Sequence, residues 1–289
     1  MSRYSPCFGS KITIDLINEI PPEDFLHVVN GNDTLLFMAC VNTGVTKDIL
    51  QRLIERGSDV THISDYGDNF VHTLCHNKNL TLELLEYALN FGFKVTDTNN
   101  IGDTPLHIIS QINSANFDKL FNYLLGKGAN INARNINNET PLYCYCNHRA
   151  ITKSLLEQYI KMGATLDSET FNAIISKSAV DESMLMYCLE TNKELLGKHS
   201  PVLSYAAIRN PGIINNSFVD FLIENGLDIN KEHSLFTPLQ HLCNNLRSTK
   251  DQIRCLIRHG AEYHQISKHK LSAHSILSYH KGEEYANSI

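Results

Sequence analysis

Hydrophobic and polar positions along the chain repeat a unit of two short amphipathic segments joined by polar turns. In the clearest copy, GDTPLHIIS at 102–110 opens one apolar segment, and a second apolar segment follows with the spacing of a helix face. The second segment ends at a glycine, Gly128, which suits the left-handed residue that closes a helix. A turn rich in Asn, Asp and Gly then leads into the next copy. The pattern predicts a helix–turn–helix unit that recurs along the chain.

The recurring unit has an identifiable first residue, which is Thr, Ser or Asn in each copy. Such residues cap the free backbone amides of a helix. At 104 and 140 this Thr precedes a proline, which suits the first helical position. The repeats are predicted to start near Thr34, Asn69, Thr104, Thr140, Thr170, Ser200 and Thr237, with a closing half-repeat from Ser272. We therefore expect an N-terminal cap at 1–33, repeats at 34–271 and a C-terminal cap at 272–289.

A small residue stands six positions after each start, where neighbouring first helices would pack closely. Any bulk there would separate the repeats. In four copies the residue is cysteine, at Cys40, Cys75, Cys146 and Cys243. These cysteines are predicted to be buried packing residues.

A period of roughly 33 residues with the motif Thr-Pro-Leu-His at 104–107 resembles the ankyrin-repeat family, over about Thr34 to Tyr279. The variants TPLYCYC and TPLQHLC resemble the divergent ankyrin proteins of poxviruses and other large DNA viruses, or of intracellular bacteria. The resemblance implies an all-α ankyrin-repeat solenoid of about seven to eight repeats with β-hairpin-like turns. It also implies that His72 and His107 form hydrogen bonds within and between hairpins.

Composition narrows the class of protein. The chain has 289 residues, of which 42% are hydrophobic, and a net charge of -6. That charge disfavours binding to nucleic acid or to an anionic membrane through the whole chain. The sequence shows neither an apolar signal-peptide region nor a run long enough to span a membrane. We expect a cytoplasmic protein, or one in the host cytoplasm or nucleus if it is viral or a bacterial effector.

Candidate chemical sites were weighed against structural explanations. Cys144, Cys146 and His148 form the densest metal-like cluster, but alternate residues of a helix point in different directions. Gly197–Ser200 lacks the remaining residues of a phosphate-binding loop. The histidines between His259 and His280 follow neither a helix face nor a strand face. The sequence therefore predicts no catalytic, cofactor or metal site.

The remaining candidate is the surface formed by turn tips and the exposed ends of the first helices. One carboxylate precedes each of four successive starts, and residues 1–140 hold 10 bases and 16 acids. This row is predicted to attract a basic partner segment. The predicted partner-binding residues are Asp33, Tyr66, Asp68, His76, Asn77, Ile101, Asp103, Gln111, Ile136, Asn137, Glu139, Asn147 and His148.

Two asparagines, Asn132 and Asn230, lie in the related turns GANIN and GLDIN. Their spacing from a preceding leucine is similar to asparagine-hydroxylase targets in other ankyrin proteins. They are candidates for hydroxylation, against the alternative that each only stabilises its turn through local hydrogen bonds.

The functional hypothesis is a monomeric, non-catalytic module that binds a host or cellular protein. The alternative is a substrate-recognition adaptor of a larger enzyme such as a ubiquitin ligase. A third hypothesis, ranked below these, is an enzyme or metal protein whose site the sequence does not reveal.

Overall fold

The computed structural model describes residues 12–25, 34–176, 180–195, 201–267 and 270–289, which contain helices and no extended strand. The chain divides into two compact units. The first unit comprises Met1–Arg149 with Lys161–Thr165, and the second comprises Ala150–Ile160 with Leu166–Ile289. Each unit is described by itself.

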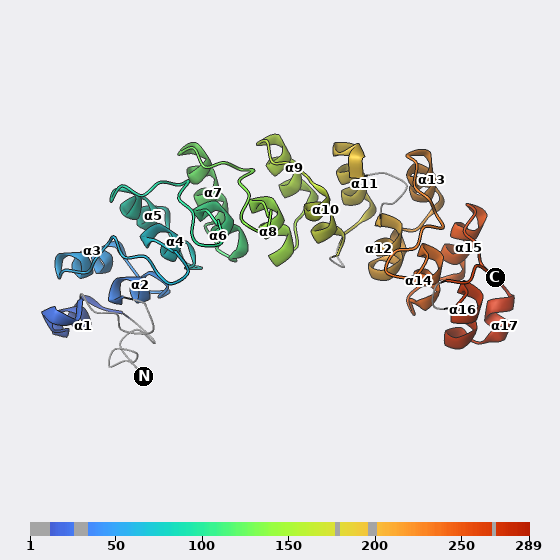
Figure 1. Cartoon of the computed structure of the whole chain (residues 1–289), viewed down its shortest axis with the longest axis horizontal. Helices are drawn as coiled ribbons and strands as arrows, with labels where there is room; N and C mark the ends of the chain where they lie inside the picture. Colours follow the sequence, from blue (N-terminus) through green and yellow to red (C-terminus); the bar gives the residue numbers. More distant parts are fainter. Residues whose placement is uncertain (1–11, 26–33, 177–179, 196–200, 268–269) are drawn as a thin grey trace. The chain divides into compact units, whose positions relative to one another are not determined.

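The first unit has two layers of helices (Figure 1). In the inner layer each helix packs on the next, and its members are α2 (Leu35–Cys40), α4 (Phe70–Cys75), α6 (Pro105–Gln111) and α8 (Pro141–His148). The outer layer stacks in the same way and consists of α1 (Ile14–Glu19), α3 (Lys47–Glu55), α5 (Leu82–Leu89) and α7 (Phe117–Gly126). The predicted pairing of a first and a second helix in each copy is confirmed for these residues.

The N-terminal segment covers the first outer helix. Helix α1 packs on α3, and a short 3-10 helix, η1 (Pro22–Phe25), follows it. The Nε of Arg52 donates to the Oδ1 of Asn18 at 2.7 Å, and the guanidinium of Arg56 lies 5.0 Å from the ring centre of Phe25. The described residues 12–25 therefore pack on one side of α3.

Inner helices begin and pack as the sequence predicts. The side chains of Thr34, Asn69 and Thr140 accept hydrogen bonds from free amides of the first turn. Cys40, Cys75, Cys146 and Cys243 are all buried, which confirms them as packing residues. Burial raises the pKa of the Cys243 thiol to about 12, so this cysteine stays protonated at neutral pH.

The turns between repeats are hairpin-like and contact one another. Within one turn the amide of Ser64 donates to the carbonyl of Asp68 at 3.0 Å. Between turns, the amide of Asn100 donates to the carbonyl of Tyr66 at 3.0 Å, and Ile136 donates to Ile101 at 2.9 Å. Backbone hydrogen bonds therefore join consecutive tips into one row.

Buried histidines connect two inner helices, α4 and α6, to the turn that follows each of them. In α6 the Nδ1 of His107 accepts from the amide of Thr104, and its Nε2 lies 3.1 Å from the carbonyls of both Ala133 and Glu139. His72 makes the equivalent bonds to Asn69 and Asp97. The expected role of both histidines is confirmed. Gln240 takes the same place in α14, where its amide reaches the carbonyls of Gln265 and Leu271.

This arrangement predicts a dependence of stability on pH. Burial lowers the pKa of His72 and of His107 below the ordinary value, so the unfolded chain binds these protons more strongly. The free energy of unfolding should therefore fall as the pH drops below about 6.5. In the variant His72→Gln/His107→Gln, each new glutamine can make the hydrogen bonds that Gln240 makes in α14. The variant lacks the two imidazole groups that would bind a proton as the pH falls. Urea denaturation at pH 7 and pH 5 should show a smaller loss of stability for the variant than for wild type, and equal losses would contradict this explanation.

The second unit repeats the two layers. Its inner helices, each packed on the next, are α10 (Ser168–Ile175), α12 (Val202–Arg209), α14 (Pro238–Asn244) and α16 (Ala273–Lys281). Its other helices are α9 (Lys153–Lys161), α11 (Glu182–Thr191), η2 (Lys193–Leu195), η3 (Pro211–Ile213), α13 (Asn216–Glu224), α15 (Lys250–Arg258) and α17 (Glu283–Asn287). Ser272 caps α16. The last helix of the second unit, α17, packs on α16.

One predicted repeat start is wrong. Helix α10 is capped by Asp167, whose carboxylate accepts from the amide of Thr170 at 2.9 Å. Thr170 itself lies buried inside the helix. The sequence pattern missed this because Asp is an equally good cap, and Thr170 happened to fit the expected interval. The predicted start at Ser200 lies outside the described residues, and α12 begins directly after Pro201.

Candidate functional site

A pocket of about 410 Å³ opens on the inner face of the first unit, between the inner helices α2, α4 and α6 and the adjoining turn tips. It is lined by Phe37, Val41, Ser64, Tyr66, Asp68, Thr73, His76, Asn99, Ile101, Asp103 and Gln111. Six of these, Tyr66, Asp68, His76, Ile101, Asp103 and Gln111, were predicted as partner-binding residues. We call this pocket the inner groove.

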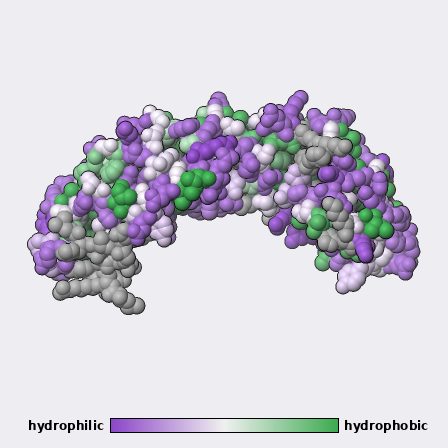
Figure 2. Space-filling view, in the orientation of Figure 1, coloured by the Kyte–Doolittle hydropathy of each residue, from purple (hydrophilic) through white to green (hydrophobic). Residues whose placement is uncertain are grey.

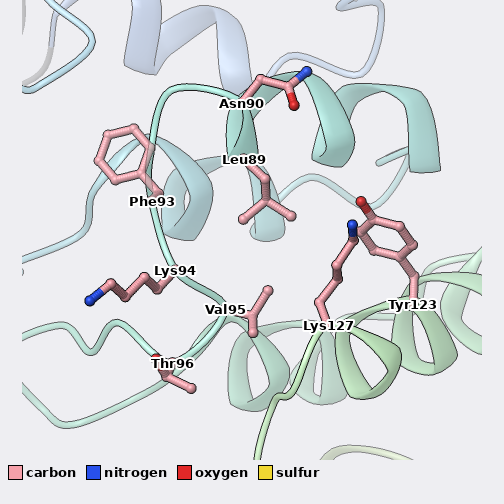
Figure 3. Close-up of a pocket in the computed structure, with 8 residues that line it drawn as sticks. All are labelled: Leu89, Asn90, Phe93, Lys94, Val95, Thr96, Tyr123 and Lys127. Atoms are coloured by element: carbon pink, nitrogen blue, oxygen red, sulfur yellow. The ribbon is translucent and has the colours of Figure 1, made fainter.

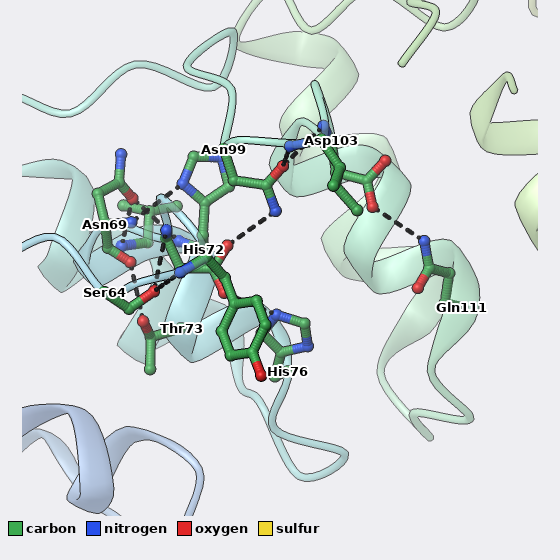
Figure 4. A network of polar contacts seen from close by, with 12 residues as sticks. Ser64, Asn69, His72, Thr73, His76, Asn99, Asp103 and Gln111 are labelled. Atoms are coloured by element: carbon green, nitrogen blue, oxygen red, sulfur yellow. Dashed lines mark hydrogen bonds and ion pairs between the residues drawn. The ribbon is translucent and has the colours of Figure 1, made fainter. Parts of the chain in front are cut away.

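Asp68 lines the groove and is held in place by Asn99 and His76, both of which are labelled in Figure 4. It is 7% exposed, and its two oxygens accept from the Nδ2 of Asn99 at 2.9 Å and from the Nε2 of His76 at 3.2 Å. Burial opposes ionisation, but the hydrogen bonds from His76 and Asn99 outweigh it and hold the pKa of Asp68 below its ordinary value. Asp68 is therefore a fixed negative charge.

The next repeat contains the same arrangement. Asp103 is buried, and it accepts from the Nδ2 of Asn135 at 2.8 Å and from the Nε2 of Gln111 at 3.1 Å (Figure 4). Asn99 and Asn135 also shape their own turns, because the Oδ1 of each accepts backbone amides of the tip that follows it. Each asparagine thus fixes a tip and clamps the carboxylate of the preceding repeat.

The sequence did not identify Asn99 and Asn135 as site residues. The sequence did contain a signal for these two asparagines, because each stands five residues before the first residue of its repeat. Ser64 occupies that position in the preceding copy, where its Oγ accepts from the amide of Asp68 at 3.1 Å. Phe37, Ser64 and Thr73 also line the groove and were not predicted.

The expectation of an exposed carboxylate row is wrong. Asp68 and Asp103 are buried and hydrogen-bonded, because the turn folds each carboxylate back against the asparagine of the next repeat. Glu139 is half-buried and accepts from the Nδ2 of Asn135 at 2.9 Å. Asp33 lies outside the described residues. The negative charge of this surface therefore comes from carboxylates that are buried or half-buried.

The apolar part of the groove is exposed. Tyr66 is 78% exposed, Ile101 is 45% exposed and Val41 is 51% exposed, and all three border the fixed carboxylates. Among the described residues, no lysine or arginine lines the pocket, and His76 is the exposed basic side chain there. The groove therefore combines negative charge with apolar contact surface.

The other predicted residues lie outside the groove. Ile136 and Asn137 are exposed on the next tip, and Asn147 and His148 are exposed at the end of α8. Asn77 is buried, and its Nδ2 donates to the carbonyls of Cys40 at 2.7 Å and Asn42 at 2.8 Å. A role for Asn77 in direct contact with a partner is therefore wrong, since it ties α4 to the preceding repeat.

A second pocket, of about 400 Å³, lies between the C-terminal ends of α5 and α7 (Figure 3). Leu89, Phe93 and Val95 form one side, and the Nζ of Lys127 lies 5.3 Å from the ring centre of Tyr123 on the other. Lys127 caps the C-terminus of α7, where a cation stabilises the helix dipole. This structural role accounts for the lysine, so the pocket is the weaker candidate.

Asn132 and Asn230 form matching bridges to the following repeat. The Nδ2 of Asn132 donates to the carbonyl of Gly163 at 2.8 Å, and its Oδ1 accepts from the amide of Thr165 at 2.8 Å. Asn230 makes the same pair of bonds, each of 2.9 Å, with Gly260 and Glu262. These side-chain bonds join consecutive repeats, in place of the local turn bonds that were the alternative. Hydroxylation of either asparagine stays a prediction.

In the part of the chain that the structure describes, no cluster of three or more His, Cys, Asp or Glu side chains is arranged to hold a metal ion. Cys144 is buried and its pKa is raised to about 12, chiefly by burial, so its thiol is protonated. None of the described helices combines the length and apolar composition that a membrane span requires.

Comparison with known proteins agrees with the geometry. A family model described as ankyrin repeats matches residues 36–135, in three copies. No curated protein matches the chain. Ankyrin repeats generally mediate protein–protein interaction and are typically non-catalytic. The matched residues include most of the inner groove, and the stacked helix pairs there are those the pattern predicts. Residues 36–135 are therefore ankyrin repeats, within a chain that folds as an all-α repeat solenoid.

Proposed function

We propose that the protein is a non-catalytic interaction module that binds a protein partner through the inner groove. The observation that carries the proposal is the combination of Tyr66, Ile101 and Val41, which are exposed apolar groups, with the fixed carboxylates of Asp68 and Asp103. Large apolar side chains left in water next to a concavity are typical of binding surfaces. The rigid tips support this role, because the residues that position them are already hydrogen-bonded before a partner arrives.

The chemistry of the groove favours a partner segment with a lysine or arginine beside apolar residues. The cation would approach Asp68 and Asp103, which share the pocket with no lysine or arginine from the described part of the chain. The apolar side chains of the partner segment would cover Ile101 and the ring of Tyr66. We propose that the protein acts as a monomer in the cytoplasm on a host or cellular protein, as the resemblance to viral and bacterial ankyrin proteins suggests.

Affinity purification with mass spectrometry tests the proposal. Wild-type chain, the groove variant Tyr66→Ala/Ile101→Ala and a control variant, Met162→Ala/Ile223→Ala, should be compared as baits. The control removes two other exposed apolar side chains, which lie outside the groove. We expect wild type and control to recover the same partner and the groove variant to lose it. Equal recovery by all three baits would contradict the proposal, and a co-purifying ligase subunit would favour the adaptor alternative.

A further inference from the structure

Three consecutive inner helices of the second unit, α12, α14 and α16, have a charge opposite to that of the inner groove. The stretches 201–219, 233–249 and 263–282, which contain α12, α14 and α16, include no aspartate or glutamate. The same stretches contain Arg209, Arg247, Lys268, Lys270 and Lys281. The acidic residues that flank these stretches are Asp220 in α13, Asp251 in α15, Glu283 in α17, and Glu232 and Glu262 in the turns.

Each of the three inner helices ends with an exposed apolar residue next to a basic one. Ile208 precedes Arg209 at the end of α12, Leu246 precedes Arg247 just after α14, and Tyr279 stands two residues before Lys281 in α16. Their exposed fractions are 37% for Ile208, 74% for Leu246 and 85% for Tyr279. Figure 2 shows hydrophobic surface set among hydrophilic surface over these helices.

Hydrogen bonds hold the three helix ends side by side. The Nδ2 of Asn245, after α14, donates to the carbonyls of Ala207 at 2.8 Å and Ile208 at 3.0 Å in α12. His280 of α16 lies 2.8 Å from the Oδ1 of Asn244, and the Nζ of Lys281 donates to the carbonyl of Ser248 at 2.7 Å. The helix ends that carry the apolar–basic pairs therefore lie next to one another.

We propose that the ends of α12, α14 and α16 form a second binding surface, which takes an acidic, apolar-containing segment of a partner protein. Carboxylates of such a segment would meet Arg209 and Arg247, and its apolar side chains would cover Ile208, Leu246 and Tyr279. Protein is favoured over nucleic acid because two of the three exposed apolar groups are aliphatic. Single-stranded nucleic acid is bound mainly on aromatic rings, and duplexes are bound through many phosphate contacts.

This surface is separate from the inner groove, and its charge selects the opposite kind of partner. A protein that uses both surfaces would bring a basic segment and an acidic segment together. Because the two surfaces share no residue, failure of one proposal leaves the other standing.

The test uses the full chain and three fluorescent probes. One peptide alternates glutamate with leucine and phenylalanine, a second has lysine in place of each glutamate, and the third probe is a single-stranded DNA oligonucleotide. The surface variant is Arg209→Glu/Arg247→Glu, and Tyr279→Ala removes an apolar contact without changing charge. The control, Lys231→Glu/Arg258→Glu, makes the same charge change at two exposed bases outside the three helix ends.

Fluorescence anisotropy should show that wild type and control bind the acidic peptide with similar affinity. The surface variant should bind it about tenfold or more weakly, and Tyr279→Ala should also weaken it. Circular dichroism should show that all variants are folded. The proposal is overturned if wild type does not bind the acidic peptide, if the control loses as much affinity as the surface variant, or if wild type prefers the lysine peptide at this surface or the DNA.

Discussion

The variant Gly67→Ala should lose about 2–5 kcal/mol of unfolding free energy, which is more than we expect for the variant Gly92→Ala. Gly67 has a φ of +78°, a conformation that an L side chain adopts only with strain. A Cβ there would lie 2.5 Å from the backbone nitrogen of Asn100, which donates to Tyr66 across the two tips. The added methyl group must push apart the backbones of two repeats.

Gly92→Ala is the matched control. Gly92 has a φ of +94°, but a Cβ there would meet no atom within 4 Å. It should lose only the conformational cost, about 1–2 kcal/mol. Equilibrium urea denaturation monitored by circular dichroism measures both losses. If the two variants are equally stable, close contact between the tips does not contribute to stability, and our account of the tip row is wrong.

Removing Tyr66 or Ile101 should have the largest effect on binding. A partner that covers these side chains loses a buried anchor in Tyr66→Ala or Ile101→Ala, which costs about 1–4 kcal/mol, or roughly tenfold or more in dissociation rate. The association rate should change little, because the fixed carboxylates of Asp68 and Asp103 still attract a basic segment. Surface plasmon resonance with the purified partner resolves the two rates.

Asp68→Asn provides the complementary change. It removes one charge while the amide oxygen can still accept from Asn99, so association should slow and its dependence on salt should weaken. Dissociation should be less affected than in Tyr66→Ala. If the alanine variants dissociate at the wild-type rate, the exposed apolar groups are not anchors, and the groove is not where the partner binds.

Much of the fold follows from local patterns in the sequence. The starts at Thr34, Asn69, Thr140 and Thr237 are observed as helix caps, since capping depends on the residue and its immediate neighbours. The buried cysteines follow from spacing alone. The start near Thr170 was missed because two capping residues, Asp167 and Thr170, stand one turn apart and the pattern cannot rank them.

The candidate site was predicted only in part. The tips were located correctly, and Tyr66 and Ile101 are exposed as expected. The burial of Asp68 and Asp103 was not foreseen because it depends on contacts between repeats. Asn99 and Asn135 reach back from the following copy to clamp these carboxylates, and a pattern within one repeat does not contain that contact. Other asparagines, such as Asn77, Asn132 and Asn230, also bond across repeats.

Hydrogen–deuterium exchange of the full chain, alone and with the protein recovered by affinity purification, tests the central claim most directly. Binding in the inner groove predicts slower exchange in residues 37–41, 64–76 and 99–111, which carry the residues that line it. Outer helices α3 and α5 of the same repeats should exchange at unchanged rates. Protection that leaves these three segments unchanged, and appears elsewhere in the chain, would contradict the account.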